Sequence, residues 1–388
     1  MMAIRIGAGL STELDPREGA IAAATEAAAG IGDDQCDLAI VFASGSHLAA
    51  PEATLEGVHE ALSPGGLVGC GAGGVLGRGR EIEDGTAVSV LALSLDAGRA
   101  EPFRALARPV DDGLVIEGLP SLAGADGVVL VPDPYSFPTD AILADLRDRA
   151  PGVPVIGGVS SARTLDGAGA LFYGDEVAEE GAVGLRLEGI ETLPCVSQGA
   201  APIGPELEIT AAEGHVICEL EGKPALERLR EVIVGLDEDE RAMIGGGLLV
   251  GLAVDFDTPD HRQHDFLVRS LLGADPKAGT VALGARVRPG QAIRLHARDA
   301  ASADEDLREA LELRREALGG RPPAGALVFT CNGRGAQMFG EPDHDAAVLE
   351  RELAGAPAAG FFAAGEIGPV GGENFLHGFT ATMAIFAP

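Results

Sequence analysis

The stretch GALVFTCNGRG (residues 325–335) is followed by a helical segment at 343–354, by GFFAAGEIGP (360–369) and by HGFTATMAIF (377–386). Each quoted segment is apolar enough for a buried strand, and the first ends in a polar turn. Two strands joined by a helix run parallel, with a right-handed crossover. We therefore expect a β-α-β-β unit whose third strand folds back as a hairpin.

Two earlier stretches repeat this pattern. The first has DLAIVFASG (37–45), a helix at 51–62, GLVGCGAGGVLG (66–77) and GTAVSVLAL (85–93). The second has GVVLVPDP (127–134), a helix at 139–150, VPVIGGVSS (153–161) and EGAVGLRL (180–187). GCGAGGVL and GFFAAGEI align without a gap, so Val75 stands where Glu366 stands. The sequence predicts three repeats whose strands end at comparable edges, where sites are usually built.

The rest of the chain is predicted from local signals. Asp15 followed by Pro16 predicts the start of a helix. Residues 190–206 are rich in Pro and Gly and predict a linker. After it, two strands meet at the turn Glu213-Gly214, and a helix covers 224–236. Four candidate strands follow, and a helix at 302–318 begins with the capping box Ser302–Glu305. We expect an α/β fold with two domains, 1–200 and 201–388. Each has mixed β-sheets with helices packed outside, and a layered αββα sandwich is one arrangement open to them.

Composition excludes several classes of function. The 388 residues include 28 basic and 60 acidic ones, for a net charge of −32, and such a surface repels nucleic acid. No apolar run reaches membrane-spanning length, and MMAIRIGAGL lacks signal-peptide architecture, so we expect a cytoplasmic protein without membrane contact. The five cysteines are scattered without a C-x-x-C pair, which predicts neither a disulfide framework nor a zinc knuckle.

We expect the functional site at the third repeat. Parallel strands place Cys331, Asn332 and Arg334 at the same carboxyl edge as Glu366, and the hairpin turns Asn374 and His377 towards that edge. A carboxylate at Glu366 is costly to bury unless it meets a cation, and Arg334 is the candidate. A structural Arg334–Glu366 pair without a ligand is the alternative.

The function favoured by this pattern is non-catalytic binding of a small polar ligand. An amino acid would suit the edge, with its carboxylate on Arg334 and its ammonium on Glu366. No cofactor and no metal are expected. The predicted ligand-binding residues are Cys331, Asn332, Arg334, Glu366, Asn374, His377, Arg269, Ser44 and Ser160. Arg269 lies mid-strand among apolar neighbours and could equally form a structural salt bridge.

Four other interpretations stay open. Cys331 could be the nucleophile of a hydrolase or transferase, with His377 as base and Glu366 or Asn374 orienting it. The chain could be an interaction module without a ligand. GCGAGGVLGRG is typical of dinucleotide binding only if a helix follows, whereas EIEDGTAVSVLAL predicts a turn and a strand. A metal could bind the cluster Asp255, Asp257, Asp260, His261, His264 and Asp265, although such clusters are more often solvated loops.

Several of these motifs resemble a known family. CNGRG and GFFAAGEIGPVGGENFLHGFTATMAIF, with ICELEGKPALERL and FLVRSLLGAD, resemble the C-terminal FIST domain. DLAIVFASG with GCGAGGVLGRG, on to Leu187, is similar to the N-terminal FIST domain, although Gly74-Val75-Leu76 departs from the family's usual Gly-Glu ending. The resemblance implies a sensory module of bacterial signalling that binds small ligands such as amino acids. It also implies a signalling partner that acts in trans.

Overall fold

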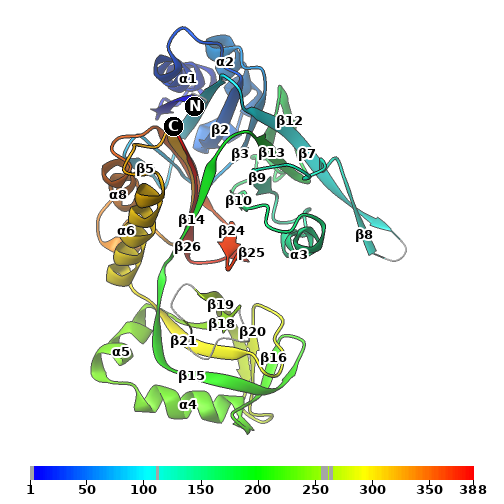
Figure 1. Cartoon of the computed structure of the whole chain (residues 1–388), viewed down its shortest axis with the longest axis vertical. Coiled ribbons are helices and arrows are strands. Elements are labelled where there is room, and N and C mark those ends of the chain that lie inside the picture. The colour runs from blue at the N-terminus through cyan, green and yellow to red at the C-terminus, as the bar shows by residue number, and fades with distance from the viewer. Residues whose placement is uncertain (1–3, 111–112, 255–260, 262–264) are drawn as a thin grey trace. The chain divides into compact units, whose positions relative to one another are not determined.

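The chain folds into two compact units. The computed structural model describes residues 4–110, 113–254, 261 and 265–388 (Figure 1). The larger unit comprises Met1–Ser197, Leu307–Leu376 and Thr380–Pro388, and the smaller unit comprises Gln198–Asp306 with His377–Phe379. The expected α/β class with mixed sheets is confirmed. In the larger unit, the third repeat packs with the first two.

Three mixed sheets make up the larger unit. In spatial order, the first contains β1 (Ile4–Ser11), β6 (Ala87–Leu95), β2 (Leu38–Ser44), β3 (Leu67–Gly71), β11 (Leu171–Tyr173) and β12 (Glu176–Ala178). The second contains β25 (Glu373–His377), β24 (Glu366–Val370), β10 (Val155–Gly158), β9 (Gly127–Pro132), β13 (Ala182–Glu188), β7 (Arg99–Val110) and β8 (Gly113–Glu117). The third contains β14 (Thr192–Gln198), β26 (Thr380–Phe386), β22 (Gly325–Cys331), β23 (Ala358–Ala363), β4 (Val75–Gly77) and β5 (Arg80–Ile82).

Each predicted repeat supplies one parallel strand pair, as expected. These pairs are β2–β3, β9–β10 and β22–β23. The glycine-rich strand of each repeat, however, leaves its own sheet for the next one. β3 continues into β4 beside β23, β23 continues into β24 beside β10, and β10 leads to β11 beside β3. The three sheets are therefore joined in a closed cycle, and GLVGCGAGGVLG is two strands in different sheets rather than one.

A glycine lies in the second strand of each parallel pair, in register with a residue of the first strand. A Cβ atom at this position would overlap the carbonyl oxygen of that neighbour, so only glycine fits without a backbone shift. The three glycine and partner pairs are Gly69 with Val41, Gly157 with Leu130, and Gly360 with Val328. This shared contact shows that the repeats are equivalent in structure as well as in sequence.

The inner faces of the three sheets share one core, so the arrangement is not a two-sheet αββα sandwich. Phe42 of β2 packs against Phe329 and Phe361 of the third sheet, with ring centroids 6.3 and 4.9 Å away. The helices cover the outer faces (Figure 1). They are α1 (Pro16–Ile31) and α2 (Pro51–Leu62) on the first sheet, α3 (Thr139–Arg149) on the second, and α6 (Ala300–Ala317) and α8 (His344–Glu352) on the third.

Helix starts follow the capping signals with one exception. Asp15 accepts hydrogen bonds from the backbone of Arg17 and Glu18, and α1 begins at Pro16 as predicted. The predicted capping box at Ser302 is not the start of α6. The Asp299 carboxylate accepts the Ser302 backbone N–H at 2.7 Å and its hydroxyl at 2.6 Å, so the helix starts at Ala300. Aspartate is as good an N-cap as serine, and the earlier of the two is used.

The smaller unit is a sheet that closes on itself. Its strands, in order, are β15 (Ala200–Glu213), β21 (Ala292–Arg298), β18 (Leu248–Ala253), β19 (Phe266–Asp275), β20 (Thr280–Leu283), β16 (Val216–Leu220) and β17 (Lys223–Pro224). β15 also pairs with β16 across the predicted Glu213-Gly214 turn, which completes the ring. The helices α4 (Ala225–Gly235) and α5 (Glu238–Met243) belong to this unit, and Leu229 and Val232 of α4 contribute to its core.

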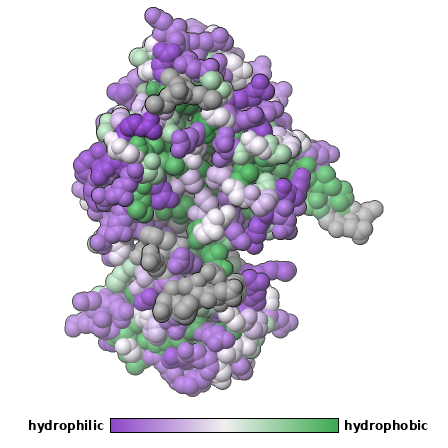
Figure 2. Space-filling model, in the orientation of Figure 1, coloured by the Kyte–Doolittle hydropathy of each residue, from purple (hydrophilic) through white to green (hydrophobic). Residues whose placement is uncertain are grey.

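The surface is mostly hydrophilic, in keeping with the acidic composition (Figure 2). Apolar side chains gather on the β7–β8 hairpin, where Val110, Leu114 and Val115 are exposed (Figure 2). Among the helices of the described residues, none is both long and apolar enough to cross a membrane.

Candidate functional site

The two loops of the third repeat meet at the expected edge. Cys331, the last residue of β22, is in register with Ala363 at the end of β23. Beyond them, the Asn332 N–H donates to Ala363 O at 3.1 Å, which holds the two chains together as they leave the sheet. Because β24 begins at Glu366, this side chain lies just past that junction. In the first repeat, β4 begins at the equivalent Val75.

Arg334 is completely buried and forms a bidentate ion pair with Asp345 at the start of α8. Its Nε donates to Asp345 Oδ2 at 2.8 Å and its Nη2 donates to Oδ1 at 3.0 Å. Thr330 Oγ1 donates to the same carboxylate at 3.0 Å, and His344 Nδ1 lies 3.1 Å from it. Burial alone would raise the pKa of Asp345, but Arg334 and His344 outweigh it and lower that pKa to about 2. Asp345 is therefore ionised across the physiological range.

Two carboxylates of the first repeat reach the helices of the third. Glu81 of β5 accepts the Ala346 N–H in the first turn of α8 at 3.0 Å. Glu83 accepts the Ala336 N–H at the start of α7 (Ala336–Phe339) at 2.8 Å. Burial, and then the nearby charge of Asp345, raises the pKa of Glu81 to about 8. Sequence analysis missed both glutamates, because EIEDG shows only a turn and a strand.

Glu366 is completely buried, and its two oxygens have different surroundings. Oε2 accepts the Thr380 backbone N–H at 3.1 Å and the Thr380 hydroxyl at 2.8 Å. Within the described part of the chain, Oε1 has no hydrogen-bond partner. Burial raises the pKa of Glu366 to about 8, although Thr380, the Arg334 charge and the Cys331 thiol each act to lower it. The carboxyl is therefore mostly protonated at neutral pH.

The predicted serines hold strand ends of other repeats. Ser44 Oγ, at the end of β2, donates to Gly85 O at 3.0 Å. Ser160, just after β10, donates to Gly71 O at 3.1 Å, and the next residue, Ser161, accepts the Gly73 N–H at 2.9 Å. Both contacts tie the end of the second repeat's strand to the point where the first repeat's strand changes sheet.

The three remaining predicted residues are on other strands, Asn374 and His377 on β25 and Arg269 on β19. Asn374 bridges the amino end of β10, accepting Val155 N–H at 2.9 Å and donating to Val153 O at 2.8 Å. His377 is buried at the end of β25 and belongs to the smaller unit. So does Arg269 on β19, whose Nη1 donates to the Val268 carbonyl at 3.0 Å.

Most of the candidate metal cluster cannot be placed. Asp255, Asp257, Asp260 and His264 lie outside the described residues. His261 Nδ1 lies 2.9 Å from Glu206 Oε2. Within the described ranges there is no group of three or more His, Cys, Asp or Glu side chains that could hold a metal.

Comparison with known proteins agrees with the sequence motifs. The model of the FIST N domain matches residues 37–223, and that of the FIST C domain matches 225–369. This chain belongs to the FIST family. An uncharacterized protein of Mycobacterium tuberculosis strain H37Rv is 43% identical over 99% of this chain and 100% of its own length. An uncharacterized protein of Mycobacterium bovis is also 43% identical, over 99% of each chain. FIST domains are generally modules of sensing and signal transduction.

The polar residues described above come from both FIST domains. Glu81 and Ser160 fall within the match to the N domain, whereas Arg334, Asp345 and Glu366 fall within the match to the C domain. Thr380, which binds Glu366, lies beyond both matches. The boundary between the family models, near residue 224, is thus not a boundary of the site.

Proposed function

We propose that this FIST protein is a sensory module that binds a small polar metabolite, and that Glu366 receives an ammonium group of that ligand. The observation that supports this proposal is that the Glu366 carboxyl is fully buried. Among the described residues, its Oε1 has no hydrogen-bond partner. Leaving a buried polar atom unsatisfied costs about 1–3 kcal/mol. A ligand donor at Oε1 would remove this cost.

The chemistry of Glu366 favours an ammonium over a neutral donor. A cation beside the carboxyl stabilises its ionised form, so binding lowers its raised pKa and releases a proton. The sequence alone places the carboxylate of the ligand on Arg334. Because Nε and Nη2 of Arg334 donate to Asp345, we do not assign the ligand carboxylate to Arg334. The exposed Asn332 and the half-buried Cys331 border the same strand ends and would face the rest of an amino-acid-like ligand. A partner protein acting in trans would respond to the bound state.

A thermal-shift screen of amino acids and small primary amines tests the proposal. A ligand at a hundredfold excess over its Kd stabilises the native state by roughly 3 kcal/mol. We expect a shift for wild type and none for Glu366→Gln, which keeps the shape of the protonated acid but cannot ionise. Glu341→Gln, an exposed change of equal charge, is the matched control and should keep the shift.

Calorimetry in buffers of different ionisation enthalpy then measures the released proton. Release of close to one proton at pH 7 is expected for wild type. The proposal is wrong if no amine or amino acid stabilises wild type, or if Glu366→Gln retains the full shift.

A further inference from the structure

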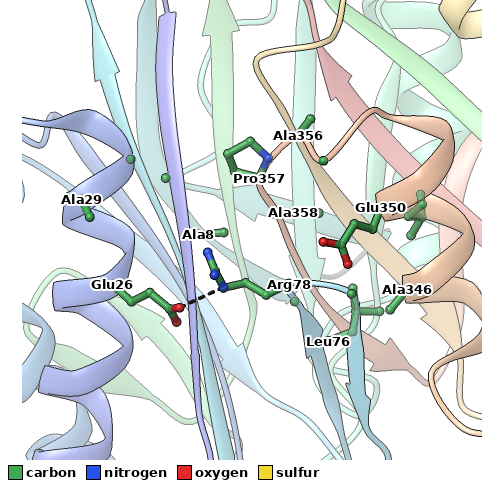
Figure 3. A pocket seen from close by; sticks show the side chains of 16 residues that line it. Ala8, Glu26, Ala29, Leu76, Arg78, Ala346, Glu350, Ala356, Pro357 and Ala358 are labelled. Atoms are coloured by element: carbon green, nitrogen blue, oxygen red, sulfur yellow. Dashed lines mark ion pairs between the residues drawn. The ribbon is translucent and has the colours of Figure 1, made fainter.

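A second region of the larger unit has the features of a binding site. A cavity of about 580 Å³ lies between the N-terminal elements and the third repeat, beside the β4–β5 turn of the first repeat (Figure 3). α1 and β1 form one wall, and α8 with the start of β23 forms the other. Much of its lining is small, including Gly7, Ala8, Gly77, Ala346 and Ala358. None of these residues belongs to the Glu366 site, and the volume is within the usual range for small-molecule pockets.

Opposite charges project into this cavity. Arg78 Nε forms an ion pair with Glu26 Oε1 at 2.9 Å, and the rest of its guanidinium extends into the open space (Figure 3). The carboxylate of Glu350 on α8 projects into the same space from the opposite wall (Figure 3). Glu350 has no ion-pair or side-chain hydrogen-bond partner within the described ranges. The cavity thus offers one guanidinium edge and one unpaired carboxylate.

The position of Arg78 is structurally unusual. Arg78 and Gly79 connect β4 to β5, with φ angles of +52° and +67°. Two-residue turns with positive φ at both positions favour Asn-Gly, and a left-handed conformation costs a residue such as arginine about 1–2 kcal/mol. A Cβ atom at Gly79 would also overlap the Glu350 carboxylate, so the glycine lets α8 bring that group against the turn. Glu350 therefore lies against the turn that carries Arg78.

The wall formed by β1 adds main-chain hydrogen-bonding groups. Among the strands that the structure describes, β1 is the edge strand of its sheet and pairs only with β6. The Leu10 N–H donates to Glu26 Oε2 at 3.1 Å and so points away from β6. Main-chain direction alternates along an antiparallel strand, so the N–H and C=O of Ala8, two residues earlier, point to the same open edge. Ala8 lines the cavity and can pair with an extended peptide there.

We propose that this cavity binds a short peptide with free ends. Arg78 binds its terminal carboxylate, Glu350 binds its terminal ammonium, and Ala8 pairs with its main chain. A simple anion is disfavoured, because Glu26 and Glu350 flank the single cation in a protein of net charge −32. A simple cation would leave the open edge of Arg78 and the Ala8 main chain unused. A peptide with both ends free matches all three features.

Calorimetric titration of the full chain at about 0.15 M salt tests this assignment, because nonspecific attraction of cations is then largely screened. Ala-Ala and Ala-Ala-Ala are the probes. We expect one of them to bind wild type, and acetylation of the amino end or amidation of the carboxyl end to weaken binding about tenfold or more. Methylation of the peptide nitrogen, which leaves both charges, tests pairing with Ala8 and should also weaken binding.

Single substitutions test which residue binds each end of the peptide. Arg78→Gln should remove the effect of amidation, and Glu350→Gln should remove the effect of acetylation. Arg80→Gln is the matched control, since Arg80 is exposed on the same hairpin and does not line the cavity. The inference is overturned if neither peptide binds at millimolar concentration or if both substitutions leave the affinity unchanged. If only Glu366→Gln lost peptide binding, the peptide would bind at the Glu366 site. That result would also overturn the inference.

Discussion

Arg334 and Asp345 form a bidentate ion pair with both side chains at most 1% exposed. The pair connects the loop after β22 to the first turn of α8. In the first repeat His47, also three residues past its strand, lies 3.0 Å from Thr54 Oγ1 of α2. Burial lowers the pKa of His47 to about 4, so a neutral pair occupies the place of the charged one. The repeats thus share a connection between strand end and helix but not its charge.

Removing one member of the Arg334–Asp345 pair should strongly destabilise the protein. Arg334→Ala leaves Asp345 buried without its main cation, a change that costs about 3–5 kcal/mol in comparable pairs. Urea unfolding measures the difference. Arg351→Ala, which removes an exposed partner of Glu352, is the control and should cost at most about 1 kcal/mol. Equal losses for the two variants would show that the buried pair has no special role in stability.

Stability should fall as the pH rises from about 5 to about 8. Folding raises the pKa of Glu366 and of Glu81 from about 4.5 to about 8. Between these values the unfolded chain has lost protons that the native state retains, so rising pH favours unfolding. Below this window both states are protonated, and above it both are ionised. In Glu366→Gln, urea unfolding across this window should show a weaker decline than wild type. An unchanged pH profile would mean that Glu366 is not held protonated.

Cysteine alkylation should divide the thiols into two groups. Cys36, Cys70 and Cys195 are buried, and burial raises the pKa of Cys36 to about 11. Cys218 and Cys331 are half-buried. Iodoacetamide followed by peptide mass analysis should therefore modify only Cys218 and Cys331 in the folded protein. Much faster modification of Cys331 than of Cys218 would favour the nucleophile alternative. Modification of the three buried thiols before denaturation would contradict the structure.

The equivalent glycines should not tolerate a methyl group. Gly360→Ala places Cβ against the carbonyl of Val328, and backbone must shift to accept it. Overpacking of this kind typically costs about 1–3 kcal/mol. Gly235→Ala, at the end of α4 with open space around its Cα, is the matched control and should be neutral or slightly stabilising. The midpoints of thermal unfolding of the two variants test this prediction. Equal midpoints would count against the close contact between Gly360 and the Val328 carbonyl.

Local features were predictable from the sequence because their causes are local. α2 has the predicted bounds Pro51–Leu62, and the N-cap Asp15 was identified from its type and the following Pro16. The parallel pairs followed from the strand-helix-strand order. The exchange of strands was not predictable, because an apolar pattern reports that a strand is buried and not which strand lies beside it.

The partners at the site depend on distant parts of the chain. The sequence predicted Glu366 as the partner of Arg334 and gave no reason to single out Asp345. The packing of α8 against the loop after β22 brings Asp345 to Arg334. Glu81 is 265 residues from its partner Ala346, and the contact exists because β4 and β5 join the third sheet. No local pattern carries that information.

The closed cycle of strands also affects synthesis on the ribosome. The first sheet is completed by β12, the second needs β24 and β25, and β4 and β5 pair only with each other among the described strands until β23 exists. A nascent chain that has finished its first two repeats therefore still exposes unpaired strand edges, which are prone to aggregation. We expect ribosome-bound chains to become resistant to protease only after residues 358–386 have left the exit tunnel. Native structure in the larger unit is then acquired only when the third repeat is available, rather than repeat by repeat.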